Sequence, residues 1–230
     1  MKRYLITGAS RGIGRAIAEK LAENNVTLFL HGRDVAALRE TTNLVEANGA
    51  ISRQLRADLG DKSSIRALIE QVSGEPLDAL INNAGIAVVK PLDKISIEEW
   101  ERTFAINVTA PFLLSQGLIP AMSQGGSIVN ILSIAAKAGF AGWSSYCMSK
   151  FALEGFSQAI REELRARKIR VINIYPAATD TDIWNAVEGE RPREKMISAG
   201  QVASAVAYTL AQPSDVLIEN ITLGNLSGSL

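Results

Sequence analysis

The chain has 230 residues, of which 47% are hydrophobic and 21% charged, and its formal net charge is zero. This length can bury one sizeable core but not a second substrate domain, and the balanced charge argues against nucleic acid or a membrane surface as the main partner. Cys147 is the only cysteine, which excludes a disulfide within the chain and a cysteine zinc cluster, so a reducing compartment such as the cytoplasm is expected.

The first predicted elements lie in residues 4–24, and the rest of the chain is organised around them. A short apolar run breaks at Gly8, Gly12 and Gly14, and apolar residues then recur at helical spacing. This pattern predicts a strand, a tight turn, and a helix that begins near Gly12 and ends near Asn24. Glycines in such a turn let a phosphate approach the amides at the helix N-terminus. We therefore interpret the segment as a cradle for the pyrophosphate of a dinucleotide.

The same segment also fits a second motif, the G-x-S-x-G elbow of serine hydrolases, at Gly8 to Gly12. Such a serine needs an acid and then a histidine downstream in the chain. The single histidine, His31, closes the next predicted strand and precedes every plausible orienting acid. This order argues against a serine hydrolase and favours a structural role for His31.

The second predicted strand, Val26–His31, is followed by Gly32, Arg33 and Asp34. In a dinucleotide fold this strand end meets the adenosine ribose, where an acidic residue would bind the 2′-hydroxyl. Glycine stands at that position and Arg33 follows, which favours the 2′-phosphate of NADP(H) over NAD(H), with Arg11 as a second clamp. In the alternative interpretation, both arginines are solvated loop residues.

Helices and strands continue to alternate along the chain. Asp34 is expected to cap a helix that reaches Ala47, and a strand follows over Ile51–Arg56. Asp61 is expected to cap the next helix, and Leu77–Ile81 is a fourth strand. This alternation predicts a parallel sheet of the βαβ type.

Polar residues follow two of these strands. Asp58 could accept a hydrogen bond from the adenine amine or could tie up a turn, and its position alone leaves both open. Asn82, Asn83, Ala84 and Gly85 end the fourth strand, at the sheet edge where open α/β proteins bind ligands. As an isolated motif, this second group could also be an ordinary turn.

A capping box at Ser96 to Glu99 opens a long helix that extends towards Met122. Pro111 lies inside it and is expected to bend the helix or to mark a junction. Asn107 has apolar neighbours, so its amide is expected to be buried and to need partners. Both a structural and a functional role are open for Asn107.

The next strand is predicted over Ser127–Leu132, after a turn at Gly125–Gly126 and just before Ser133. Ser144 then opens a helix in which Tyr146 and Lys150 are four residues apart and share one face. A phenol has a free pKa of about 10, and lowering it by about three units takes roughly 4 kcal/mol. The Lys150 ammonium would supply part of that, although the same spacing is also a common surface pattern.

Taken together, these motifs resemble the classical short-chain dehydrogenase/reductases. The resemblance runs from the first strand to about Thr181 and rests on residues 7–14, residues 82–85, Asn107, Ser133 and residues 146–150. It implies that Tyr146 exchanges a proton with the carbonyl oxygen of the substrate and that Ser133 bonds the same oxygen. It also implies that Lys150 holds the nicotinamide ribose and lowers the pKa of Tyr146, and that Asn107 holds a water linked to Lys150.

The cofactor contacts expected from the loop analysis and the resemblance are Gly8, Ser10, Arg11, Gly12, Ile13, Gly14, Arg33, Asp58, Leu59, Asn83, Ala84, Gly85, Tyr146, Lys150, Pro176, Thr179 and Thr181. After the sixth strand, Arg170–Tyr175, the chain departs from the family pattern. Ala177 replaces a glycine, and Thr179 takes a usually aliphatic position. These departures leave open whether the loop on the nicotinamide side has the geometry of the family.

Residues 182–199 are expected to form a lid over the substrate, because the family places its mobile loop there. Trp184, with Phe140 and Trp143 from an earlier loop, could stack on an apolar substrate or could pack the lid on the body of the protein. The basic cluster at residues 191–195 could receive a carboxylate or a phosphopantetheine phosphate, although the glutamates among the basic residues favour a solvated loop.

The chain is expected to close with a helix over Gln201–Leu210 and a strand over Val216–Leu223. We therefore predict one α/β domain over residues 1–230, a Rossmann-like doubly wound parallel sheet of about seven strands with helices on both faces. No apolar stretch approaches the length of a membrane span.

The predicted function is NADP(H)-dependent hydride transfer between the nicotinamide and a carbonyl or secondary alcohol of a small molecule, with no metal. The alternatives are a 3-oxoacyl-(acyl-carrier-protein) reductase and a non-catalytic NADP(H)-binding sensor or scaffold. The resemblance also implies a homodimer or homotetramer built on the faces of the two long helices.

Overall fold

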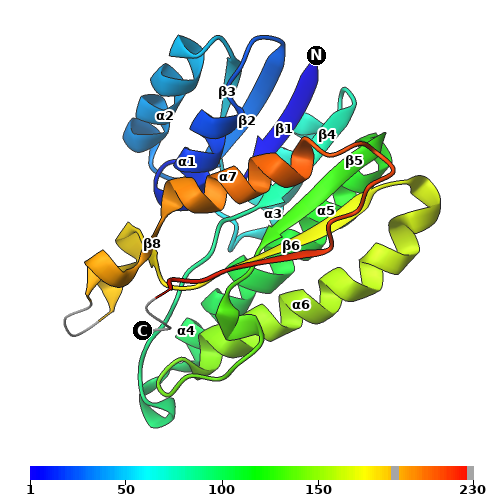
Figure 1. The fold of residues 1–230 in the computed structure, drawn as a ribbon. Helices are drawn as coiled ribbons and strands as arrows, with labels where there is room; N and C mark the ends of the chain where they lie inside the picture. The colour runs from blue at the N-terminus through cyan, green and yellow to red at the C-terminus, as the bar shows by residue number, and fades with distance from the viewer. Residues whose placement is uncertain (188–191, 227–230) are drawn as a thin grey trace.

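The computed structural model describes residues 1–187 and 192–226, and its centre is a seven-stranded sheet (Figure 1). The strand order is β3-β2-β1-β4-β5-β6-β9, and every neighbouring pair is parallel. The strands are β1 Lys2–Ile6, β2 Val26–Gly32, β3 Ile51–Arg56, β4 Leu77–Asn82, β5 Met122–Ile131, β6 Arg170–Pro176 and β9 Asn220–Leu223. The order changes direction between β1 and β4, which opens a crevice for a ligand at the carboxyl ends of these two strands.

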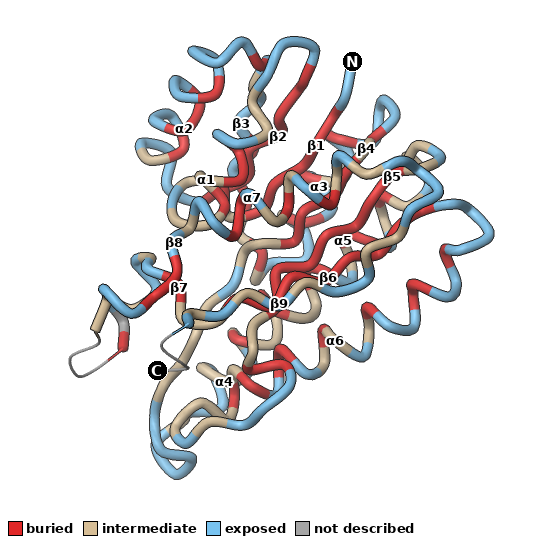
Figure 2. Tube along the Cα trace, in the orientation of Figure 1, coloured by how far each residue is buried: buried red, intermediate tan, exposed pale blue. Residues whose placement is uncertain are grey.

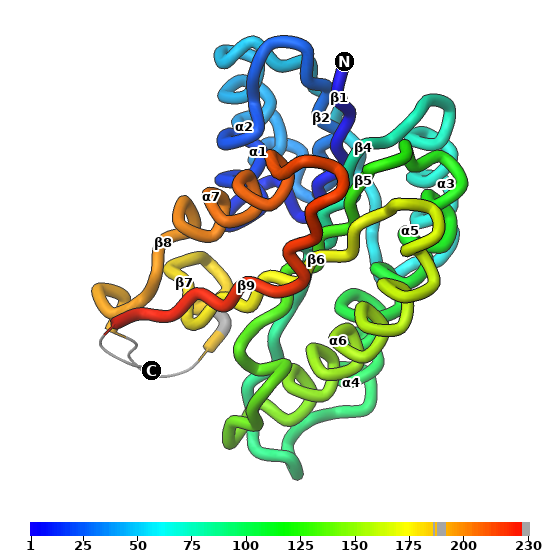
Figure 3. Tube along the Cα trace, turned by 45° about the vertical axis from the view of Figure 1, so that its right-hand side comes forward, coloured from blue at the N-terminus to red at the C-terminus, as the bar shows by residue number. Residues whose placement is uncertain are grey.

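Helices cover both faces of the sheet, as predicted. They are α1 Gly12–Leu21, α2 Val35–Ala47, α3 Lys62–Val72, α4 Ile97–Phe104, α5 Ala110–Leu118, α6 Ser144–Leu164 and α7 Ala199–Leu210. One apolar core lies under α1, α2 and α7, and a second lies under α3, α5 and α6. Figure 3 shows the two helical layers on opposite sides of the sheet.

The central strands are buried along almost their whole length (Figure 2). Successive side chains point to opposite cores: Leu5 belongs to one core, and its neighbours Tyr4 and Ile6 belong to the other. A strand that is covered on both faces is apolar at most of its positions, which explains the nearly continuous apolar runs in the sequence.

Three predicted helix caps are present. Asp34 accepts a hydrogen bond from the Ala37 amide, and Asp61 accepts bonds from the amides of the next helix. Ser96 forms the expected capping box with Glu99. These caps satisfy amides that have no partner inside their helices, so the helix starts were readable from local sequence.

Several element ends differ from the predictions. Helix α1 ends at Leu21 rather than Asn24, because the chain turns there and Asn25 takes a left-handed conformation with φ of 66°. Strand β5 starts at Met122, so Gly125 and Gly126 lie within it rather than in a turn before it. The pairing of β5 with β4 shifts register between Leu77 and Ala79, which marks a bulge beside the two glycines. Strand β9 is also shorter than predicted and begins at Asn220 rather than Val216.

The predicted junction at Pro111 is a π-helical turn over Ala105–Thr109 that joins α4 to α5. The Ala110 amide donates to the Ala105 carbonyl, five residues back. Proline has no N–H, so Pro111 cannot donate to the Asn107 carbonyl four residues before it. The π-helical turn therefore accommodates Pro111 without ending the helix. Asn107 lies within this turn.

By length and composition alone, the helical stretch Ile97–Ala121 could cross a membrane, since it has 25 residues and includes an 18-residue window with a mean hydropathy of 1.3; the sequence did not lead us to expect this. Its first turns carry several charged residues, and Ala110, Leu114 and Leu118 pack in the core beside the sheet. We therefore assign the stretch to the layer that covers the sheet.

After β6 the chain forms a small separate sheet that was not predicted. Strand β7, Thr179–Asp180, pairs in parallel with β8, Ile197–Ser198. A 3-10 turn at Asp182–Ala186 lies between them, and Ser198 and Gln201 form a capping box at the start of α7. Residues 188–191 of the predicted lid, with Arg191 of its basic cluster, lie outside the described residues.

Candidate active site

The glycine-rich loop between β1 and α1 has the geometry of a phosphate cradle. Gly8 has φ of 68° and Gly12 φ of 56°, which only glycine adopts readily. Gly14 has no room for a side chain, because a Cβ there would lie 2.1 Å from the Gly8 carbonyl oxygen. Helix α1 is therefore packed directly against the turn that precedes it.

The N-terminus of α1 is open towards this loop. Its N-cap residue, Arg11, makes no side-chain capping bond, and the first turn holds no acidic residue. The free amides and the positive end of the helix dipole favour an anion at this point. The loop thus fits the pyrophosphate of a dinucleotide, as predicted from the sequence.

His31 is a structural residue of this loop. It is buried, its Nδ1 accepts a hydrogen bond from the Gly8 amide at 3.3 Å, and its Nε2 lies 3.2 Å from the Ala57 carbonyl oxygen. We place the proton on Nε2, since only this tautomer satisfies both partners. Burial lowers the pKa of His31 to about 4, so the ring is neutral at pH 7.

The pH dependence of stability tests this role. The pKa of His31 is about 4 when folded and about 6.5 when unfolded, so between these values only the unfolded chain takes up the proton. The free energy of unfolding is expected to lose this contribution as the pH falls below 6.5. Between about pH 7.5 and pH 5 the loss is roughly 2 kcal/mol. Urea unfolding at both pH values measures the fall in the free energy of unfolding. In His31→Gln this fall should be smaller than in the wild type by the same amount, and equal falls in the two proteins would contradict the assignment.

The cavity on the adenosine side contains the residues predicted to select the cofactor. Arg11, Gly32, Arg33 and Leu59 line it, and both arginines are exposed. Arg11 also lies 3.9 Å from the Asp182 carboxylate, an exposed ion pair that contributes little to stability. Two cationic side chains therefore lie at this cavity.

Asp58 lines the same cavity and ties up a turn, one of the two roles left open by the sequence. It accepts a hydrogen bond from the Gly60 amide at 2.9 Å. Both of its oxygens also accept from the Arg102 guanidinium, at 2.8 and 2.9 Å. These hydrogen bonds, led by that from Gly60, lower the pKa of Asp58. Arg102 links helix α4 to the adenosine side, a contact that no sequence signal indicated.

The turn after β4 is bound to the glycine-rich loop. The Asn83 side chain donates to the carbonyls of Thr7 and Gly8, at 2.8 and 3.2 Å. The Thr7 hydroxyl accepts from the amides of Asn83 and Ala84. Asn83 and Thr7 thus position both loops at the crevice, and Asn83 does so through its side-chain amide rather than by leaving it free.

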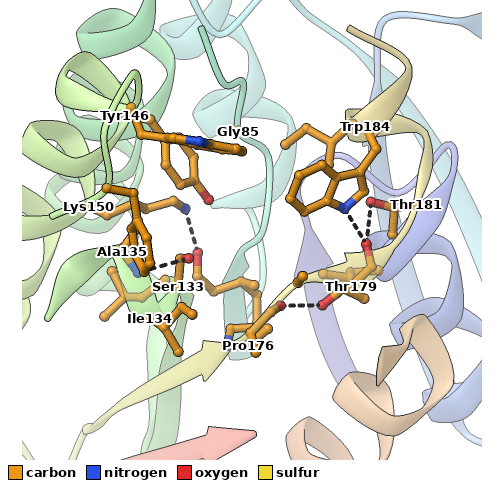
Figure 4. Close-up of a pocket in the computed structure, with 18 of the residues that line it drawn as sticks. Gly85, Ser133, Ile134, Ala135, Tyr146, Lys150, Pro176, Thr179, Thr181 and Trp184 are labelled. Atoms are coloured by element: carbon orange, nitrogen blue, oxygen red, sulfur yellow. Dashed lines mark hydrogen bonds between the residues drawn. The ribbon is translucent and has the colours of Figure 1, made fainter. Parts of the chain in front are cut away.

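A second cavity, of about 470 Å³, gathers the predicted acid/base residues (Figure 4). Ser133 from the end of β5 lines it together with Tyr146 and Lys150 from the first turns of α6. The Ser133 oxygen accepts from the Ala135 amide at 3.1 Å, which orients its hydroxyl. The Lys150 ammonium lies 5.6 Å from the centre of the Tyr146 ring and donates to the Ile131 carbonyl at 2.8 Å.

The two cavities are continuous. Ile13, Asn83, Gly85 and Thr181 line both of them. An extended ligand can therefore run from the arginines at one end to Ser133 and Tyr146 at the other.

Asn107 lies behind Lys150, fully buried. Its side chain accepts from the Ile86 amide, and it donates to the Ile86 carbonyl and to the Ser149 hydroxyl. Ser149 in turn donates to the Tyr146 carbonyl at 2.7 Å. Ser149 therefore connects Asn107 to the tyrosine helix, a role the sequence analysis missed because a serine inside a helix gives no such signal.

The protein environment shifts the pKa values of Tyr146 and Lys150 so that both residues favour their neutral forms. Burial raises the pKa of Tyr146 to about 12, and the Ser133 hydroxyl opposes this only partly. Burial lowers the pKa of Lys150 to about 8. In this structure burial is thus the largest influence on the pKa of Tyr146, and the lowering expected from Lys150 remains a prediction.

The loop after β6 accommodates both departures from the family pattern. Among the described residues other than glycine, only Asn25 and Lys168 have positive φ, so Ala177 needs no glycine conformation. The Thr179 hydroxyl donates to the Ala177 carbonyl at 2.9 Å, which closes the loop on itself. Pro176, Thr179 and Thr181 all line the catalytic cavity.

Comparison with known proteins assigns the family. The sequence model of the short chain dehydrogenases matches residues 2–192. The chain belongs to the short-chain dehydrogenase/reductase family. It is an oxidoreductase that acts on carbonyl or alcohol groups with a nicotinamide cofactor.

Two curated relatives of this family are similar over nearly their whole length. The sepiapterin reductase of Chlorobaculum tepidum is 32% identical over 98% of this chain and 97% of the relative. The 3-oxoacyl-(acyl-carrier-protein) reductase of Escherichia coli is also 32% identical, over 96% and 94%. Their names give different substrates at equal identity, so identity does not select between the two activities for this short-chain dehydrogenase/reductase.

The fold is likewise that of solved family members. A short chain dehydrogenase from Burkholderia cenocepacia, solved in complex with NADP, superimposes with a TM-score of 0.88 at 31% identity, over 97% of this chain and 96% of that one. This agreement confirms the predicted fold class.

Proposed function

We propose that this short-chain dehydrogenase/reductase is an NADP(H)-dependent reductase of small carbonyl compounds, with Tyr146 as the general acid. The observation that carries the proposal is the single continuous crevice, which has two arginines at one end and the Ser133–Tyr146–Lys150 group at the other. A bound nicotinamide would supply or accept the hydride. The protein would supply position, a proton and fixed hydrogen-bond donors.

Each residue of the group has a distinct role in this proposal. Tyr146, neutral at pH 7 because its pKa is about 12, donates its phenol proton to the carbonyl oxygen as that oxygen becomes negative. Ser133 donates a hydrogen bond to the same oxygen and stabilises the charge. Lys150 binds the ribose and stabilises the phenolate that remains on Tyr146. The π-helical turn at Asn107 would offer a carbonyl for a water that returns the proton.

The remaining proposals concern the surroundings of the site. Residues 182–199 would close over the substrate, and residues 1–230 would act as one domain. We also propose a cytoplasmic homodimer or homotetramer built on α5 and α6. On these helices Phe112, Met148 and Phe151 are 42%, 50% and 46% exposed, which suits a contact with a second copy.

The test is a cofactor titration followed by an activity screen. We expect NADPH to bind more tightly than NADH, measured by nicotinamide fluorescence. We also expect some member of a panel of ketones, aldehydes and 3-oxo thioesters to oxidise it, measured by the loss of nicotinamide absorbance. Binding without any turnover would favour a sensor or scaffold, and a strong preference for carrier-bound thioesters would favour the acyl reductase. No nucleotide binding would overturn the proposal.

Arg33 is the proposed determinant of the cofactor. Changing Arg33→Ala should raise the Kd for NADPH about 10- to 100-fold, because charge-assisted bonds to the 2′-phosphate are lost. The Kd for NADH should hardly change. Arg39→Ala, an exposed arginine on α2, is the control and should leave both constants unchanged. If Arg33→Ala weakened NADH as much as NADPH, the 2′-phosphate would not be its partner.

A further inference from the structure

The outer part of the catalytic cavity has an aromatic wall formed by Phe140, Trp143 and Trp184. The Trp143 ring lies 5.5 Å from the Tyr146 ring at 67°, and 5.6 Å from the Trp184 ring at 64°. Trp184 faces Tyr146 and Ser133 across the cavity (Figure 4). A substrate that reaches the two hydroxyls must therefore pass along tryptophan faces.

A hydrogen bond from its own indole N–H holds the Trp184 ring in place. Its Nε1 donates to the Thr179 carbonyl at 2.9 Å, so the indole N–H is already occupied by the protein. The carbon atoms of the ring contact Trp143 and line the cavity. Beside it the cavity is lined by Ile134, Ala178 and Pro192, which also present only carbon from their side chains.

Charge is confined to the inner end of the cavity. Lys150 is the only charged side chain among the described residues that line it, and its ammonium is bonded to the Ile131 carbonyl. Arg193, a described cation of the lid, is bonded to the Asp180 carboxylate and to the Asn185 side chain, at 2.8 and 2.7 Å. Among the described residues that line the cavity, a carboxylate or phosphate on the substrate would therefore find no free cationic partner to offset its desolvation.

The hydroxyl groups that could bind a substrate carbonyl are also few. Ser133 and Tyr146 both direct their hydroxyls into the cavity, which suits one carbonyl oxygen. The cavity of about 470 Å³ must also hold the nicotinamide, since it shares Ile13 and Gly85 with the cofactor side. What remains is a compact slot with one polar end and aromatic walls.

We propose that the substrate is an uncharged ketone or aldehyde whose carbonyl is flanked by a flat aromatic group, and that Trp143 and Trp184 bind this group. The inference rests on the proposed carbonyl reductase function and names its substrate class. Offset or edge-on contacts with the two indoles would orient the ring, and the carbonyl would then lie against the two hydroxyls.

Two pairs of probes test the class. Methyl phenylglyoxylate and phenylglyoxylate are the same aryl ketone without and with a negative charge. We expect kcat/KM with NADPH to be at least about 100-fold higher for the ester, because the cavity offers the carboxylate no partner. Acetophenone should be preferred over cyclohexyl methyl ketone by about tenfold, since only the flat ring stacks.

Substitutions in the wall separate packing from recognition. Trp184→Ala should raise KM for acetophenone about tenfold with little change in kcat and should remove the preference for aryl over cyclohexyl ketones. Trp184→Phe keeps a ring and should retain most of that preference, which controls for misfolding. Ala178→Arg places a cation on the wall and should raise kcat/KM for phenylglyoxylate above that of the wild type.

A binding measurement separates this inference from the proposed activity. The affinity for acetophenone in the presence of NADP, measured by quenching of tryptophan fluorescence, should fall about tenfold in Trp184→Ala, in line with its KM, whether or not turnover occurs. Quenching without turnover of any carbonyl would support the pocket and overturn the activity. Equal or better turnover of phenylglyoxylate, or of carrier-bound thioesters, would overturn the substrate class and leave the reductase intact.

Discussion

Changing Tyr146→Phe is expected to lower kcat for NADPH-dependent carbonyl reduction by about 1,000-fold, because the general acid is lost. The ring contact with Trp143 at 5.5 Å is kept, so the fold and the cavity should survive. Loss of one hydroxyl should weaken NADPH binding by no more than about tenfold. Steady-state rates and fluorescence titration of the same preparation would measure both quantities.

Tyr208→Phe is the matched control for this experiment. Tyr208 lies on α7 and is 59% exposed, so loss of its hydroxyl should change neither the rate nor the affinity. Ser133→Ala should give a smaller loss of about 100-fold, because it removes one hydrogen bond to the oxygen and leaves the proton donor. A Tyr146→Phe enzyme that kept a tenth or more of the activity would place the proton donor on another group.

The pKa of Tyr146 bears on whether the site reduces a carbonyl or oxidises an alcohol. The protein keeps Tyr146 protonated, since burial raises its pKa to about 12. A protonated phenol can act as an acid in carbonyl reduction without any adjustment. Oxidation of an alcohol needs the phenolate, so it depends on positive charge from Lys150 and from an oxidised nicotinamide. The sequence analysis considered the helpful charges near Tyr146 but could not weigh the burial that opposes them.

Local sequence signals determined most of the fold. Strands covered on both faces are mostly apolar, and several helix starts have side-chain caps, so both can be predicted from short segments such as residues 26–32 and Ser96 to Glu99. Strand β5 was misjudged because two glycines normally mark a turn. Here the register shift against β4 takes them into a bulge, and that depends on a partner strand far away in sequence.

The candidate site could be predicted from motifs that occur together in one order, and less so where it depends on tertiary partners. The glycines of the loop and the spacing of Tyr146 and Lys150 give a signal when taken together, although each alone also fits other patterns. The contributions of Thr7, Arg102 and Ser149 do not, because each acts through a hydrogen bond to another element. Such partners are brought together only by the folded chain.

The glycine-rich loop gives the second large expected effect. In Gly14→Ala the new Cβ would lie 2.1 Å from the Gly8 carbonyl oxygen and 2.6 Å from the Asn83 amide nitrogen, so the helix or the loop must move. A displacement of about 1 Å in a positioning element costs about 100-fold in kcat/KM. Overpacking should also lower the free energy of unfolding by about 1–3 kcal/mol.

Gly74→Ala is the control for Gly14→Ala, because a Cβ at position 74 would meet no atom within 4 Å. It should leave NADPH binding, kcat/KM and stability close to those of the wild type. Isothermal titration with NADPH and urea unfolding of the two variants measure the affinity and the stability separately. If Gly14→Ala bound NADPH as the wild type does, α1 and the loop would not need to be in direct contact, and the pyrophosphate cradle would have to lie elsewhere. If it lost affinity while its stability fell by only about 1 kcal/mol, the close approach of helix to loop would be required for the cofactor rather than for the fold.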